Sequence, residues 1–354
     1  MTSNELFQSY FKLQPHSQAT AHGRVNLIGE HTDYNNGFVL PTLIPQKISV
    51  SIGLRDDNKI IGNSQEFGES QCILGSALNG SWLDFVLGAI HFIKQTGVVI
   101  QGINIAVKSD IPSGTGLSSS AALEIAILKT LIKIFNVSIS PAELARIGQK
   151  IEHEFIGTQC GIMDQMACAS LKLGEVLFLD CENLQTKIFS LFSTHHFLVI
   201  NSGSSRKLSE GNYNQRKMET SKAAQFLNIP SLRHATADQL NKIEDRIIYK
   251  RARHIVSENN RVLQSLDCLE NNKPMKFGRL MDASHRSMAE DYEISSKELD
   301  DLVNAAKSAG ALGARLTGAG FGGCVVVLVS KENSEKVASS VAKQCPQSSL
   351  VTVI

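Results

Sequence analysis

The sequence lacks the features that mark several large classes of protein. Its 354 residues include 35 Lys and Arg against 34 Asp and Glu, so the formal net charge is +1 and no strong field is offered to nucleic acid or to an anionic membrane. The longest unbroken apolar run, Cys324–Val329, is far shorter than the roughly 20 residues that a membrane helix needs. The N-terminal residues show no basic segment followed by an apolar one, so we expect no secretion signal and a cytoplasmic location.

Cysteine is scarce and scattered. The seven cysteines include no C-x-x-C pair, and their odd number argues against a disulfide framework or a zinc cluster. We therefore expect all seven to be small buried side chains. The sequence contains no internal repeat, no low-complexity segment and no sign of a coiled coil, so we expect a monomer.

The pattern of apolar residues predicts a mixture of strands and helices. These do not alternate strictly, which favours an α+β fold over a doubly wound sheet. Strand patterns cover Lys47–Gly53, Ile103–Val107, Glu175–Leu179, Phe197–Ile200 and Cys324–Val329. Helical patterns cover Ser119–Phe135, Pro141–Ile156, Ile162–Leu171, Asn214–Leu227, Lys242–Leu269, Ser296–Ala309 and Ser334–Lys343.

The length suggests two domains or one large one. We place a boundary near residue 190, giving an N-terminal domain over residues 1–190 and a C-terminal domain over residues 191–354. The second is mostly helical, with a closing strand pair near Val325 and Val351. No linker rich in proline or glycine marks the boundary, so we expect two closely packed lobes with a ligand cleft between them.

The first glycine-rich segment runs from Ile111 to Ala126. Gly114 and Gly116 permit tight turning, and the serines 118–120 then open an apolar helix. A helix start offers unpaired N–H groups and the positive end of the dipole, which together suit a phosphate. Three hydroxyl groups exceed what capping needs and could bind phosphate or Mg²⁺, although an ordinary loop with a serine N-cap remains the alternative. The Walker pattern does not occur in the sequence.

The second segment, Leu316–Val329, contains Gly318, Gly320 and Gly323 in the order G-x-G-x-x-G. A dinucleotide fingerprint must follow a strand and open a helix, whereas these glycines precede a predicted strand. We therefore reject a nicotinamide-dependent dehydrogenase. Two interpretations stay open: a loop lying against a ligand or another backbone, and a tight turn between a helix and a strand.

The third segment, His22–Gly37, places Arg24, Glu30, His31 and Asp33 among apolar residues. Such side chains suit several hydroxyl groups of a sugar, and the arginine could neutralise a phosphoryl group. The spacing of the acidic residues and the histidine matches no zinc or EF-hand pattern, so a metal site is the weaker interpretation.

Together these segments resemble the GHMP family of small-molecule kinases, and GRVNLIGEHTDYNNG is similar to the signature of its galactokinase branch. The resemblance covers most of the chain. It implies an α+β, two-lobed GHMP kinase fold: an N-terminal lobe like domain 2 of ribosomal protein S5, a ferredoxin-like C-terminal lobe, and an active site in the cleft. Further similar segments are SWLDFVLG (Ser81–Gly88), CGIMDQMA (Cys160–Ala167), GNYNQRKME (Gly211–Glu219) and MDASHRSM (Met281–Met288).

The resemblance also implies roles for individual residues. Asp164 matches the catalytic aspartate, and Arg24 matches the arginine that steadies the transferred phosphoryl group. Ser120 and Glu152 match the two ligands of Mg²⁺. The sugar-binding residues are then Glu30, His31, Thr32, Asp33 and Tyr213, and the ATP loop comprises Gly114, Thr115, Gly116, Leu117, Ser118, Ser119 and Ser120.

The implied reaction is ATP-dependent phosphorylation of the C1 hydroxyl of D-galactose, the first step of galactose use. The alternatives are a kinase for a related sugar such as N-acetylgalactosamine and a non-catalytic sugar sensor on the same fold. The presence of Arg24, Ser120, Glu152 and Asp164 argues against a sensor. The sequence does not decide whether Asp164 is a true base or an orienting, electrostatic group.

Some residues support the resemblance independently. Ser140–Glu143 reads as a capping box with proline at the first helical position, and Gly157 would end that helix. Glu152 then flanks the buried face and could point into a cleft. Asp164 lies between two methionines, where a carboxylate is either structural or functional.

Three residues remain open at this stage. His22 and Asn36 stand where the family usually has proline and glycine, and asparagine tolerates the left-handed backbone better than most residues. Trp82, the only tryptophan, is either a core residue or a contact for adenine, and core packing is slightly favoured.

Overall fold

The computed structural model describes residues 1–204 and 209–354. The chain forms two compact units, and each collects segments from several parts of the sequence. No single boundary therefore separates them, and the division at residue 190 stays a prediction about the domains. Unit 1 comprises Met1–Arg24, Pro45–Pro112 and Ser118–Ser170, and unit 2 comprises Val25–Ile44, Ser113–Leu117 and Leu171–Ile354.

Unit 1 contains strands in the order β3-β6-β4-β5, with β1 paired to β3. Strands β3 and β6 are antiparallel, and β4 pairs with β6 in parallel. The predicted strands at Lys47–Gly53 and Ile103–Val107 lie within β3 and β6. Polar residues dominate β1 and β5, which is why the apolar pattern did not predict them. The strands are β1 (Ser17–Asn26), β3 (Pro41–Arg55), β4 (Lys59–Ser64), β5 (Gly68–Ile73) and β6 (Gly102–Ser109).

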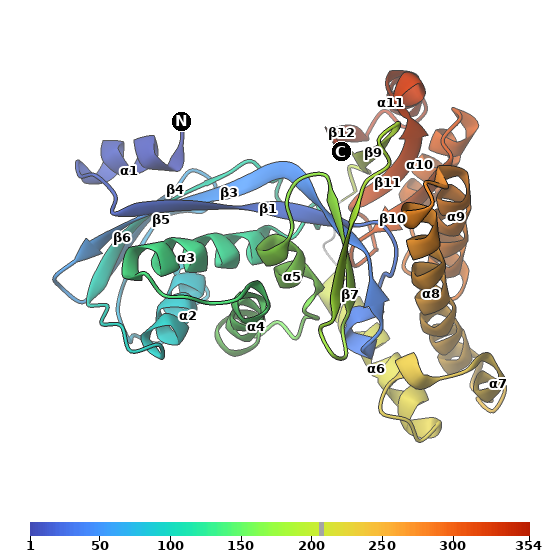
Figure 1. Ribbon diagram of the computed structural model, residues 1–354, viewed down its shortest axis with the longest axis horizontal. Coiled ribbons are helices and arrows are strands. Elements are labelled where there is room, and N and C mark those ends of the chain that lie inside the picture. Colours follow the sequence, from blue (N-terminus) through green and yellow to red (C-terminus); the bar gives the residue numbers. More distant parts are fainter. Residues whose placement is uncertain (205–208) are drawn as a thin grey trace. The chain divides into compact units, whose positions relative to one another are not determined.

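Four helices of unit 1 lie on one side of these strands and α1 lies on the other (Figure 1). Helix α3 has the predicted bounds, and α4 continues into a π-helical segment, Glu152–Ile156, that ends at Gly157 with φ 86°. The capping serine of α4, Ser140, accepts a hydrogen bond from the Glu143 amide as predicted. The helices are α1 (Ser3–Phe11), α2 (Leu83–Lys94), α3 (Ser119–Phe135), α4 (Pro141–Ile151) and α5 (Met163–Ser170).

Unit 2 contains a four-stranded antiparallel sheet in the order β10-β11-β9-β12. The expected closing strand pair near Val325 and Val351 is wrong in one respect: both strands exist, but each pairs with β9 rather than with the other. A second group is formed by β7, which pairs with β2 and β8. The strands are β2 (Phe38–Val39), β7 (Glu175–Asp180), β8 (Thr186–Ser190), β9 (His195–Asn201), β10 (Gly313–Thr317), β11 (Cys324–Ser330) and β12 (Ser349–Val353).

The helices of unit 2 pack with the four-stranded sheet around a core that includes Leu198, Leu316 and Val325. Helix α8 begins later than predicted because Asp245 caps it by accepting hydrogen bonds from two backbone amides. The helices are α6 (Ser209–Phe226), α7 (Ala237–Leu240), α8 (Arg246–Glu270), α9 (Pro274–Glu290), α10 (Lys297–Ser308) and α11 (Ser334–Gln344), with 3-10 turns at Asp33–Asn35, Leu232–His234 and Lys331–Asn333.

The mixture of helices with largely antiparallel strands confirms the α+β prediction. All seven cysteines lie in the described part of the chain, and none forms a disulfide bond. The expectation that all are buried is wrong for Cys72, Cys160 and Cys181, which are half-buried. Within residues 1–204 and 209–354, no helix is both long enough and apolar enough to cross a membrane.

Candidate active site

The side chain of Asp164 is paired with Arg24 in unit 1. The guanidinium donates from Nε to Oδ1 and from Nη2 to Oδ2, both at 2.7 Å, in the bidentate geometry that arginine forms with a carboxylate. The hydroxyl of Ser118 donates to Oδ2 at 2.5 Å. Arg24 is buried, whereas the Asp164 side chain keeps 30% of its surface exposed. The carboxylate is therefore held from one side and open on another.

Local structure explains how these three residues meet. Asp164 lies in the first turn of α5, where the helix dipole favours an acid. Arg24 lies near the end of β1, and Ser118 directly precedes α3. Residues 140 positions apart in sequence thus form the pair that the family resemblance implies, but the contact with Ser118 was not predicted.

Glu152, the implied Mg²⁺ ligand of unit 1, begins the π-helical segment after α4 and is buried. A second acid, Glu124 on α3, lies beside it. Burial raises the pKa of Glu124 well above its usual range, and the nearby carboxylate of Glu152 raises it further. Gln165 donates to Oε2 of Glu124 at 3.3 Å, while Oε1 is buried with no hydrogen-bond partner among the described residues.

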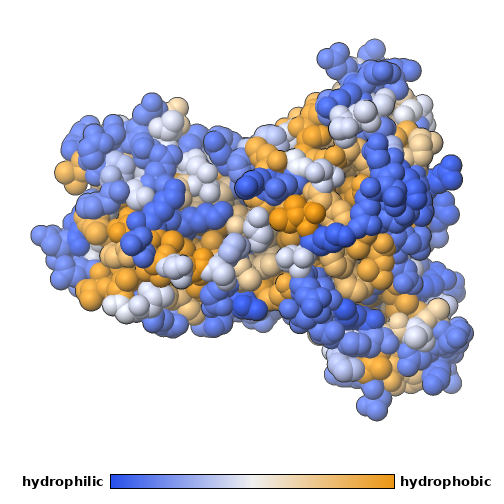
Figure 2. Space-filling view, viewed as in Figure 1, coloured by the Kyte–Doolittle hydropathy of each residue, from blue (hydrophilic) through white to orange (hydrophobic). Residues whose placement is uncertain are grey.

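Unit 1 also contains a cavity of about 460 Å³ beside the N-terminus of α3. Ser119 and Ser120 line it together with Trp82, whose ring also packs closely on Gly62, as core packing predicts. A contact of Trp82 with adenine stays a prediction. Figure 2 shows hydrophobic residues at the surface over α2, the helix that follows Trp82. The other large apolar residues that line the cavity are Phe67, Leu78, Phe85, Leu123, Phe155 and Ile156.

The glycine-rich loop before α3 has positive φ angles at alternate positions. Gly114, Gly116 and Ser118 have φ of 72°, 73° and 60°. Thr115 and Leu117, between them, are buried. Such alternation of backbone hand brings successive N–H groups toward one side, an arrangement that binds anions in many proteins.

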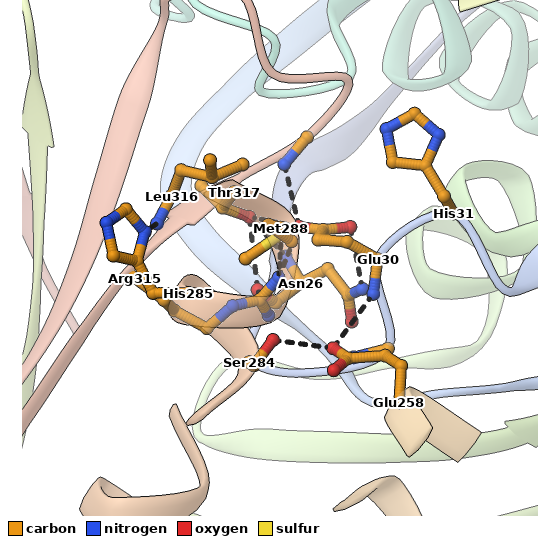
Figure 3. Close-up of polar contacts among 12 residues, drawn as sticks. Asn26, Glu30, His31, Glu258, Ser284, His285, Met288, Arg315, Leu316 and Thr317 are labelled. Atoms are coloured by element: carbon orange, nitrogen blue, oxygen red, sulfur yellow. Dashed lines mark hydrogen bonds and ion pairs between the residues drawn. The ribbon is translucent and has the colours of Figure 1, made fainter. Parts of the chain in front are cut away.

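In unit 2, Glu30 is almost completely buried and receives several hydrogen bonds (Figure 3). Its Oε1 accepts from the amide of Gly318 at 2.7 Å and from the hydroxyl of Thr317 at 2.9 Å. Its Oε2 accepts from Asn26 Nδ2 at 2.9 Å. The guanidinium of Arg315, fully buried, lies 3.3 Å from Oε1. The carboxylate of Glu30 therefore connects the sugar signature to the end of β10.

His31 is buried, and burial lowers its pKa to about 3, with the nearby His254 adding to the effect. Its Nε2 lies 3.2 Å from the carbonyl oxygen of Ala319, so this nitrogen carries the proton and donates it. Nδ1 must then accept from the hydroxyl of Tyr34 at 2.6 Å, and Tyr34 lies 2.9 Å from the hydroxyl of Tyr292. His31 is thus a neutral ring whose two nitrogens both contact the protein.

The remaining predicted sugar-binding residues differ in exposure. The hydroxyl of Thr32 is buried and faces the backbone carbonyl of Phe38 at 2.6 Å. Asp33 and Tyr213 are half-buried, and the Tyr213 ring packs against His31 with 5.4 Å between ring centroids. Asp33 and Tyr213 are therefore the two members with appreciable exposed surface.

Helix α8 supplies partners for the signature that the sequence did not reveal. Glu258 is fully buried and accepts hydrogen bonds from the Gly29 and Glu30 amides and from Ser284. His254, one turn earlier, is buried and lies 3.1 Å from the carbonyl oxygen of Glu30. Burial raises the pKa of Glu258, but Arg261, Arg315, His254 and the hydrogen bond from Ser284 together outweigh this and hold it well below its usual range. Charged residues interrupt the apolar stripe of α8, and this pattern could have indicated from the sequence that some of them are buried and have a specific role.

The glycine-rich residues 318–323 form the turn of a hairpin between β10 and β11. The dehydrogenase hypothesis is thereby excluded, because the strand before these glycines leads to another strand and not to a helix. The interpretation as a turn between a helix and a strand is also corrected, since a strand comes first. Gly320 lies against another backbone: a Cβ atom there would be 2.5 Å from the carbonyl oxygen of Ile294.

The two departures from the family pattern are accommodated. Asn36 has φ 56°, the left-handed conformation that asparagine tolerates, and its carbonyl accepts a hydrogen bond from Arg233. His22 lies within β1, where Nδ1 is 3.1 Å from the carbonyl oxygen of Pro45.

Comparisons with known proteins identify the family. Three family models match: the galactokinase galactose-binding signature over residues 5–54, the GHMP kinases N terminal domain over residues 84–171, and the GHMP kinases C terminal domain over residues 265–347. A galactokinase of Glaesserella parasuis is 39% identical over 96% of this chain and 92% of its own length. One from Exiguobacterium sibiricum is 39% identical over 96% and 91%.

The chain belongs to the galactokinase family. Among solved structures, the Lactococcus lactis galactokinase in complex with galactose matches with a TM-score of 0.92 and 33% identity, over 99% of this chain and 96% of that one. A mevalonate kinase from Methanococcus jannaschii, 22% identical, matches with a TM-score of 0.71 over 93% and 95% of the two chains and shares the fold. The prediction of a GHMP kinase fold is confirmed. The prediction that the chain belongs to the galactokinase family is confirmed as well.

Proposed function

We propose that this chain is a galactokinase, which transfers the γ-phosphoryl group of ATP to the C1 hydroxyl of D-galactose and releases galactose 1-phosphate and ADP. The observation that carries the proposal is the paired, partly exposed carboxylate of Asp164, in a chain with the family's sugar signature. The printed names of its relatives support the same reaction. A sensor is not favoured, because the implied catalytic groups are all present.

Asp164 orients the attacking sugar hydroxyl and accepts its proton as the phosphoryl group is transferred. Two charge-assisted hydrogen bonds from Arg24 fix the direction of this carboxylate, which suits an orienting role. A loose transition state needs little activation of the nucleophile, so orientation and charge suffice. Arg24 also offers positive charge to the transferred group.

ATP is the co-substrate, and the aromatic cavity of unit 1 suits an adenine ring. The loop residues 114–120 would face the phosphates through their backbone N–H groups. Mg²⁺ fits the available donors, because Ser120 and Glu152 offer oxygen atoms and Glu124 adds a buried, unpartnered carboxyl oxygen beside Glu152. When bound, the ion supplies positive charge that neutralises the phosphate oxygens.

For the sugar, we assign direct contacts to Asp33 and Tyr213, since their side chains keep exposed surface. Glu30, His31 and Thr32 contribute mainly by fixing the signature turn, because their polar atoms already contact the protein. A cytoplasmic location and a monomeric state remain predictions from the sequence.

The test is ADP release with ATP and Mg²⁺ across galactose, glucose, N-acetylgalactosamine, arabinose and no sugar. We expect turnover with galactose well above all others. Turnover highest with N-acetylgalactosamine would replace the substrate while keeping the reaction class. ATP binding by folded protein without turnover on any sugar would reject the proposal and favour a sensor.

A further inference from the structure

Ser118 directly precedes α3 but does not cap it. Its backbone is left-handed, with φ 60° and ψ 47°, and its side chain accepts no hydrogen bond from the helix. At four other α-helices the preceding Ser or Thr has an extended backbone and its side chain accepts from a helix amide, as N-caps usually do: Thr2, Ser140, Thr236 and Ser296. The hydroxyl of Ser118 is therefore used for something else.

That use is visible in the contact with Asp164. Ser118 is buried, and its Oγ lies 2.5 Å from Oδ2 of the carboxylate, to which it must donate. A serine with positive φ is uncommon, and such a conformation persists where the surrounding structure imposes it. Here the left-handed backbone turns the hydroxyl away from the helix and toward Asp164.

The partners of Asp164 are distributed unequally between its two oxygens. Among the described residues, Oδ2 accepts from both Arg24 and Ser118, whereas Oδ1 accepts only from Arg24. A carboxylate oxygen can accept two hydrogen bonds, so Oδ1 keeps the capacity for an incoming hydroxyl. The contact with Ser118 therefore leaves Oδ1, and not Oδ2, with capacity for a further hydrogen bond.

We propose that Ser118 is a positioning residue for Asp164, in addition to belonging to the ATP loop. The inference rests on the proposed function, in which Asp164 orients the C1 hydroxyl of the sugar. Loss of the serine hydroxyl would leave Arg24 as the one described partner of the carboxylate, which could then tilt about its Cβ–Cγ bond and misdirect Oδ1. Because misplacement acts on the chemical step, it lowers kcat more than it raises KM.

The test uses two variants that both lack the hydroxyl. Ser118→Gly suits the positive φ, whereas Ser118→Ala keeps the backbone strain. For both we expect kcat to fall by about 10- to 100-fold, the range for a hydrogen bond to a charged group, with KM for ATP and for galactose changed by less than about threefold. A loss confined to Ser118→Ala would show that backbone strain matters and not the hydroxyl, and would overturn the proposal.

Ser140→Ala is the matched control, because Ser140 also precedes a helix but its hydroxyl caps that helix through the Glu143 amide. We expect this variant to lower Tm and leave kcat unchanged. If the Ser118 variants instead raise KM for ATP with kcat unchanged, Ser118 serves the nucleotide alone and the proposal fails.

A second measurement does not depend on the reaction. Tm is compared for Ser118→Gly, Asp164→Ala and the double variant. If the hydroxyl acts through the carboxylate, the combined shift will be smaller than the sum of the single shifts, whereas additive shifts would refute the contact. Wild-type protein that fails to turn over galactose would count against the proposed function and leave this cycle interpretable.

Discussion

Two arginine–carboxylate pairs in this molecule have the same chemistry and opposite settings. In unit 1, Arg24 holds Asp164 in two hydrogen bonds, and the acid stays 30% exposed. In unit 2, Arg315 and Glu30 are 0% and 2% exposed, and the acid also receives an amide, a hydroxyl and a side-chain amide. The comparison shows that burial and the number of donors separate a carboxylate with exposed surface, for which we propose a contact with substrate, from an enclosed one that holds a loop in place.

The largest effect is expected from a substitution in the exposed pair, and it is on turnover. Asp164→Asn keeps the shape but removes the charge and the proton acceptor, so kcat should fall by about 10²–10⁴-fold, the usual contribution of a general base or orienting group. Galactose binding should remain detectable by calorimetry. Near-normal turnover in this variant would reject Asp164 as the catalytic residue.

At the buried pair the expected effect is on stability. Glu30→Gln leaves the buried Arg315 without its carboxylate, and removing one partner of a buried ion pair typically costs about 3–5 kcal/mol. Urea denaturation measures the loss. Glu143→Gln, which breaks the exposed pair with Arg146, is the control and should change the free energy of unfolding little. Equal effects of the two changes would contradict the distinction.

The pH dependence of stability sharpens the same contrast. Burial lowers the pKa of His31 to about 3 and that of His254 to about 4, both below the unfolded value of about 6.5. Between the folded and unfolded pKa values, the unfolded chain binds more protons than the folded one. The stability from these neutral rings is therefore fully present above about pH 6.5 and is lost as the pH falls toward 4. The loss is up to about 1.4 kcal/mol per pH unit for each ring.

His254→Gln should remove one ring's share of that slope, as measured by urea midpoints between pH 7 and pH 4. His195→Gln is the control, because His195 is only partly buried. Burial lowers its pKa as well. An unchanged slope in the His254 variant would mean that this ring is not buried in the neutral form.

The smallest effect concerns the signature turn. Asn36 has φ 56°, so glycine there should stabilise the protein by a few tenths to about 1 kcal/mol, whereas Asn36→Ala should destabilise it by about 1–2 kcal/mol. Thermal unfolding distinguishes the two. The hydrogen bond from Arg233 goes to the backbone carbonyl and should persist in both variants.

Local patterns predicted much of the fold. The bounds of α3, the N-cap of α4 and the strand character of β11 all follow from apolar periodicity and capping residues, which act over a few neighbours. Strands β1 and β5 were not predicted, because their mostly polar residues become strands only through pairing with neighbours. The partner of β12 was also decided by the sheet as a whole.

For the candidate site, the sequence by itself determined which residue types were present and which family they resemble, since motif letters and spacing are properties of the chain. Only the tertiary structure decided which of those residues are buried, which are exposed and which contact one another. The contact of Ser118 with Asp164, the support of Glu30 by Arg315 and the placing of Glu258 under the signature join residues far apart in sequence. Burial and hydrogen-bond partners, which set the charge and freedom of each side chain, exist only once distant segments have packed together.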